Sequence, residues 1–96
     1  FSGDLGANLP TTGDLDEPVT RLSEILPWMH GFHQRYMNSN KVCRLWANMV
    51  KPLDIDMIVP QHGRAFTGGA IAEFIEYIEG LQCGIDLMTQ DNYRVP

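Results

Sequence analysis

The sequence has little of what marks nucleic-acid-binding or membrane proteins. Its 7 Lys and Arg residues stand against 12 Asp and Glu residues, which gives a formal net charge of -5 at pH 7. Proteins that bind the phosphate backbone need clustered basic side chains, so we expect no nucleic-acid partner. Uncharged apolar runs are only a few residues long, whereas a membrane-spanning helix needs about 20 such residues. With no charged and apolar leader at the start, we also expect no membrane partner.

Cysteine is also scarce. Cys43 and Cys83 are the two cysteines, and neither belongs to a CxxC pair of the kind that forms redox dithiols or zinc sites. We therefore predict two buried thiols in a reducing, cytoplasmic setting. A single disulfide between them is the alternative.

What the chain does have is a hydrophobic pattern for one small domain with three helices. The 96 residues are 44% hydrophobic, enough for one core. Apolar residues at helical spacing predict a helix that starts near the acidic segment 14–17 and reaches Met29, with Pro27 kinking or ending it. The same spacing predicts the longest helix over His33 to Val50 and a third helix over Ala70 to Leu81. Residues 86–96 have no clear period and are predicted to form a loose tail.

Two short strands complete the prediction. Phe1 to Gly3 is interpreted as the end of a strand, and Met57 to Val59 as a buried strand that delivers Gln61-His62-Gly63 to its C-terminal end. Two strands are too few for an independent sheet. Either the helices pack on one another, or other strands of the sheet lie outside this sequence.

Two metal-binding side chains stand next to glycines at these strand ends. They are Asp4 in FSGDLG and His62 in VPQHGR. A strand end holds a ligand rigidly, and glycine lets the backbone turn sharply and leaves room for an ion. Each residue also has a common structural role: an Asp in a glycine-rich turn usually forms an Asx turn, and a single His is usually hydrogen-bonded.

Taken in order, the segments FSGDLGA, HGFHQRYM and DMIVPQHG resemble the C-terminal half of a metallo-β-lactamase-fold protein. The resemblance is to the branch of oxygen-binding di-iron proteins and flavodiiron proteins, and it covers nearly all of residues 1–80. It implies an α+β fold, the C-terminal portion of an αββα sandwich that is helix-rich in this chain, with about three helices and two short strands. Residues 1–96 would then form a single partial domain.

The resemblance also implies a metal site and its contents. In that family the ligands come from an HxExDH motif, a further His, an Asp that bridges the two metals, and a last His in a P-x-H-G turn. Asp4 matches the bridging Asp and His62 the last His, whereas the other motifs have no counterpart in the chain. The implied cofactors are two Fe, with Zn as the alternative and FMN in a separate domain. The implied partners are dioxygen or another small molecule and a redox partner.

A second cluster, His30, His33 and Tyr36, lies in the segment MHGFHQRY. His33 and Tyr36 are neighbours on one face of a helix. The resemblance places a Tyr from this part of the chain near the oxygen-binding pocket, so Tyr36 is a candidate hydrogen-bond donor there. A half-buried Tyr on a helix surface is the alternative. His33 and His30 are candidate additional ligands, although on their own they lack a third.

These observations favour a part of a di-iron protein that binds, senses or reduces oxygen, as an oxidoreductase or a sensor. A dinuclear zinc hydrolase of the same superfamily is the second interpretation, and a metal-free helical interaction module is the third. Without the missing ligands, these residues alone should have little catalytic activity. The apolar helix faces should favour self-association, so a homodimer is also expected.

Overall fold

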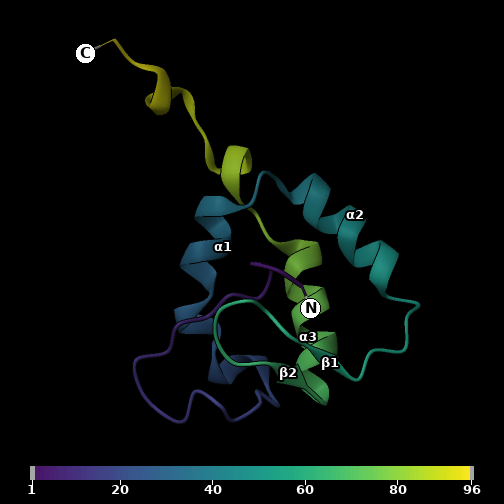
Figure 1. Cartoon of the computed structure of the whole chain (residues 1–96). Helices are drawn as coiled ribbons and strands as arrows, with labels where there is room; N and C mark the ends of the chain where they lie inside the picture. Colours follow the sequence, from purple (N-terminus) through teal and green to yellow (C-terminus); the bar gives the residue numbers. More distant parts are fainter. Residues whose placement is uncertain (1, 96) are drawn as a thin grey trace.

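The computed structural model describes residues 2–95 and has an α+β fold, as expected (Figure 1). The elements follow one another as 3-10 turns η1 (Leu22–Glu24) and η2 (Leu26–Trp28), helices α1 (His30–Tyr36) and α2 (Asn40–Val50), strands β1 (Met57–Ile58) and β2 (Phe66–Thr67), helix α3 (Gly69–Gly80), and 3-10 turns η3 (Gly84–Leu87) and η4 (Gln90–Tyr93).

Helix α3 is the centre of the core. Its residues Ala70, Phe74 and Ile78 recur at a spacing of four and are all 0% exposed. Helix α2 packs alongside it (Figure 1), and the hairpin β1–β2 adds Phe66, whose ring stacks on Phe74 at 4.9 Å. The prediction of a helix over residues 70–81 is confirmed, with a shift of one residue at each end.

The buried strand predicted at Met57–Val59 is formed over Met57–Ile58, but only Ile58 is buried, since Met57 is 47% exposed. Its partner is one that the sequence pattern did not indicate. β1 pairs antiparallel with β2, with Ile58 opposite Phe66. The predicted strand at residues 1–3 is not formed where the chain is described, and Phe1 lies outside the described residues. Ser2 and Gly3 instead reach the segment after β1 through two backbone hydrogen bonds, Ser2 N–H to Val59 O (3.0 Å) and Gln61 N–H to Gly3 O (2.7 Å).

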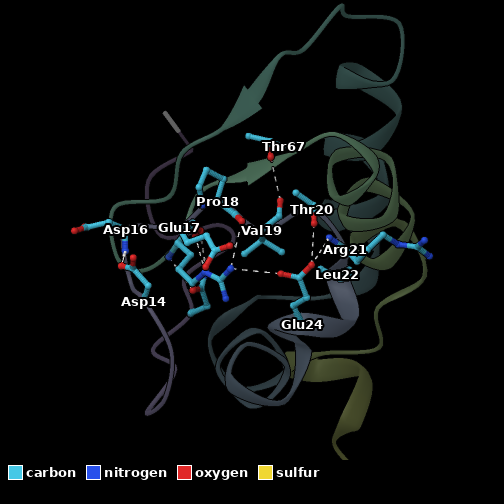
Figure 2. Close-up of polar contacts among 12 residues, drawn as sticks. Asp14, Asp16, Glu17, Pro18, Val19, Thr20, Arg21, Leu22, Glu24 and Thr67 are labelled. Carbon is cyan, nitrogen blue, oxygen red and sulfur yellow. Dashed lines mark hydrogen bonds and ion pairs between the residues drawn. The ribbon is translucent and has the colours of Figure 1, made fainter.

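The prediction of an α-helix between residues 14 and 29 is wrong, because this range contains only the short 3-10 turns η1 and η2. Val19 is extended, because its N–H donates to Ala65 O (2.7 Å) and its carbonyl accepts from Thr67 N–H (2.8 Å). After Val19 the chain forms only η1 and η2, and Pro27 lacks the N–H that a longer helix would use. Figure 2 shows the Glu24 carboxylate turned back towards Thr20.

The single long helix expected from His33 to Val50 is two helices, α1 and α2, separated by residues 37–39. The break is held by polar contacts with a distant part of the chain. The Asn38 carbonyl accepts from Ile85 N–H (2.9 Å), and the Asn40 side chain donates to Glu79 O (2.9 Å) and Leu81 O (2.8 Å). These bonds tie the start of α2 to the end of α3 and to η3, and Ser39, just before α2, is extended.

The segment 86–96, expected to be a loose tail, includes the end of the 3-10 turn η3 and all of η4, and its described residues 86–95 extend away from the core (Figure 1). Cys43 and Cys83 are both buried and free, which confirms the prediction of buried thiols; their sulfur atoms lie 3.8 Å apart. Among residues 2–95 no helix is both long and apolar enough to cross a bilayer.

Candidate metal centre

Asp4 and His62 are brought together by two turns that are 58 residues apart in sequence. The distance between Asp4 Oδ1 and His62 Nε2 is 3.8 Å. Both side chains are well exposed, at 63% and 58%, so neither is used to fill the core. Within residues 2–95, neither side chain has another hydrogen-bond or ion-pair partner.

Glycines allow the two turns to approach each other. Gly6 and Gly63 have φ angles of 92° and 103°, which L side chains rarely adopt. A Cβ at Gly63 would collide with the carbonyl oxygen of Asn8. The sequences GDLG and QHGR therefore fold as sharp turns that leave Asp4 and His62 pointing outward at their tips.

The geometry and chemistry of this pair fit metal binding. Two donor atoms that each lie about 2.1 Å from one metal ion can be at most about 4.2 Å apart, and the observed 3.8 Å is within that limit. A carboxylate can also bridge two cations, while a neutral imidazole suits iron or zinc. No group of three or more His, Cys, Asp or Glu side chains in the described part of the chain could hold an ion. Residues 2–95 thus supply two donors and no complete site.

Comparison with known proteins identifies the family. A family model described as "ODP family beta lactamase" matches residues 1–63. The chain belongs to the ODP β-lactamase family.

Two solved structures are similar to this ODP-family chain. One, "Peroxy diiron species of chemotaxis sensor ODP", is 38% identical with a TM-score of 0.81. The other, "Apo state of chemotaxis sensor ODP from T. denticola", is 36% identical with a TM-score of 0.84. Each comparison covers 98% of this chain and 38% of the other chain, so this chain spans well under half the length of either. A search of curated proteins found no match.

His33 was a candidate additional ligand, but in this chain both of its ring nitrogens already have hydrogen-bond partners. Nε2 accepts the Gly6 N–H (2.9 Å), and Nδ1 donates to Met29 O (2.8 Å). The side chain is fully buried, and this desolvation lowers the pKa of His33, with the nearby His30 adding to the effect. His33 therefore lies beneath the Asp4 turn as a neutral support and not beside Asp4 and His62.

Within residues 2–95, neither His30 nor Tyr36 shares a hydrogen bond or ion pair with Asp4 or His62. His30 Nδ1 is 2.6 Å from the Tyr77 hydroxyl, on the side of α1 that faces α3. Tyr36 is 66% exposed and packs on the Phe32 ring at 5.0 Å. Phe32, not Tyr36, lines the small cavity of about 90 Å³ that borders His62.

The rest of that cavity wall comes from Ala7, Asn8, Leu9 and Trp28. Its lining is mostly apolar, and His62 forms part of its wall. Sequence reasoning did not anticipate this cavity, because its residues come from three separate segments. The only local indication of this cavity in the sequence is that residues 7–9 directly follow the GDLG turn.

Proposed function

We propose that this chain provides part of the di-iron centre of an oxygen-sensing protein, with Asp4 as the ligand that bridges the metals and His62 as a ligand to one of them. The observation that carries the proposal is the pair itself: two exposed metal-binding side chains, from separate turns, 3.8 Å apart. The family match and the di-iron chemotaxis sensor among the similar structures support iron as the metal and dioxygen as the ligand.

In this proposal the remaining ligands come from parts of the protein outside residues 1–96. When bound, a pair of iron ions would supply the electrons and open coordination positions that dioxygen binding requires. The residues of this chain do the rest. Asp4 would offset part of the positive charge of the metals, His62 would bind one of them through its imidazole, and the mostly apolar cavity that His62 helps to line would shield a small ligand from water.

Sensing is preferred to reduction or hydrolysis because both similar structures are those of a chemotaxis sensor. The protein would act in a reducing compartment, the cytoplasm, which suits its two free thiols. It would then respond to dioxygen that diffuses into the cell.

The test is the metal content of the full-length protein after anaerobic loading with Fe²⁺ and removal of excess metal. We expect about two iron ions per chain. Asp4→Ala and His62→Ala should each lose most of the iron. Matched controls are Asp56→Ala, an exposed aspartate in the connection before β1, and His30→Ala, which removes a partly exposed histidine that is hydrogen-bonded to Tyr77. Retention of full iron by the Asp4 and His62 variants would refute the proposal, and preferential binding of Zn²⁺ would favour a hydrolase.

A further inference from the structure

We infer that Asn8 is the positioning residue that sets the distance between Asp4 and His62. This inference rests on the proposed metal-binding role of those two residues. Their own side chains are 63% and 58% exposed, so core packing does not fix them. Whatever fixes their separation has to act through the backbone of the two turns.

Asn8 joins the two turns through both its backbone and its side chain. Its N–H donates to the carbonyl of His62 (3.1 Å). Its Nδ2 donates to Gly6 O (2.8 Å) and to Arg64 O (3.1 Å), while its Oδ1 accepts the Arg64 N–H (2.9 Å). Asn8 is 1% exposed, so its own polar groups are shielded from water.

The connection reaches both sides of each candidate ligand. Asn8 binds Gly6, two residues after Asp4, and it binds both His62 and the second residue after it, Arg64. On the other side, the hydrogen bond from Gln61 N–H to Gly3 O joins the residues that precede Asp4 and His62. The turns that carry Asp4 and His62 are thus joined by hydrogen bonds both before and after these residues. Asn8 makes all the bonds described here on the side that follows them.

His33 completes the support from below. The Gly6 peptide donates its N–H to His33 Nε2 (2.9 Å), and its carbonyl accepts from Asn8 Nδ2 (2.8 Å). Both polar groups of Gly6 are therefore held by buried side chains. The Asp4 turn cannot shift relative to the His62 turn without breaking at least one of these bonds.

An amide is the group that this position requires. The two carbonyls of Gly6 and Arg64 need donors, and the Arg64 N–H needs an acceptor, which together match the N–H₂ and C=O of asparagine. Aspartate would offer only acceptors to the two carbonyls. Glutamine would need room for another methylene where Gly63 already packs against the Asn8 side chain.

The experiment measures Fe²⁺ affinity of the full-length protein, by anaerobic competition with a chromophoric chelator, in wild type, Asn8→Ala and the milder Asn8→Ser. Asn40→Ala is the matched control. It also removes a partly buried amide bound to two backbone carbonyls, those of Glu79 and Leu81, but at the α2–α3 junction. We expect Asn8→Ala to weaken Fe²⁺ binding about tenfold. We also expect it to change the EPR signal of the mixed-valent pair that forms when the Fe²⁺-loaded protein is treated with one equivalent of a one-electron chemical oxidant. We expect Asn40→Ala to lower the melting temperature with wild-type affinity and signal.

Equal affinity and an unchanged EPR signal in Asn8→Ala and Asn40→Ala would overturn the inference while leaving the metal site intact. If Asn8→Ala does not fold, Asn8→Ser decides: it keeps one hydroxyl donor, and unchanged affinity and signal in that variant would equally overturn the inference. If wild type binds no Fe²⁺, or if Asp4→Ala and His62→Ala bind it normally, the proposed function fails and the inference fails with it.

Discussion

His33 should make the protein less stable in mildly acidic solution. Both ring nitrogens are engaged in the native state, with Nε2 as an acceptor for the Gly6 N–H and Nδ1 as a donor to Met29 O. Protonation of Nε2 would remove that acceptor and place a charge in the core. Burial, and to a lesser degree the nearby His30, lower the pKa of His33 below its ordinary value of 6.5.

The direction and size of the change in stability with pH follow from proton linkage. A lowered native pKa means that the unfolded chain binds the proton first, so stability is complete above pH 6.5 and is lost as the pH falls below it. One group contributes a slope of about 1.4 kcal/mol per pH unit between its native and unfolded pKa values. Between pH 7.5 and 5.5 the loss should therefore approach, but not exceed, about 1.4 kcal/mol.

Urea unfolding of the metal-free full-length protein at pH 7.5 and 5.5, followed by tryptophan fluorescence, measures this loss. The informative variant is His33→Gln, whose carbonyl oxygen can accept the Gly6 N–H but cannot be protonated in this range. It should be less stable than wild type at pH 7.5, and its stability should change less with pH. Equal pH dependence in wild type and His33→Gln would refute the assignment of the neutral imidazole at this position.

Three other substitutions or treatments test the core and the turns. Gly63→Ala should cost at least about 2 kcal/mol in urea unfolding, because the new Cβ would collide with Asn8 O, and a neutral effect would contradict the turn geometry. Burial raises the pKa of the Cys83 thiol to about 12, with a hydrogen bond to Cys43 adding to it. Cys43 and Cys83 are both buried, so iodoacetamide at pH 8 should label these two thiols only after unfolding. Mass spectrometry before and after urea treatment checks this, and rapid labelling of the native protein would contradict it. Phe74→Ala should cost about 3–5 kcal/mol by loss of a fully buried ring, and a urea midpoint close to that of wild type would contradict its place in the core.

The sequence was most informative where local pattern and tertiary packing agree. Helix α3 was predicted almost to the residue, because the spacing of Phe74 and Ile78 matches the face that the core buries. The helix predicted from residue 14 failed although Val19 is indeed buried. Its backbone pairs with residues on either side of Phe66, and hydrogen bonds to a segment almost fifty residues away leave no trace in the helical period.

The difference between local sequence signals and long-range contacts also explains which candidate site residues could be predicted from the sequence. Asp4 and His62 were predicted because each stands in a short motif beside glycine, so the family resemblance and the turn chemistry are both local signals. Their closeness could be inferred only from the resemblance, and the structure brings the two side chains to 3.8 Å. His33 was noticed as a metal-binding residue type, but its sequence neighbours gave no sign that Gly6, 27 residues earlier, would occupy one of its nitrogens.

Asn8 shows most clearly why such a residue escapes a reading of the sequence. An asparagine two residues after a turn glycine has an ordinary local role, and nothing nearby distinguishes it from the asparagines of α2. Two of its side-chain hydrogen bonds go to Arg64, 56 residues later, in the turn that carries His62. A positioning residue of this kind is defined by the two backbones it joins, so it becomes visible only once both are in place. Candidate ligands can thus be found from their chemistry, whereas residues proposed to set the distance between them have to be found from the fold.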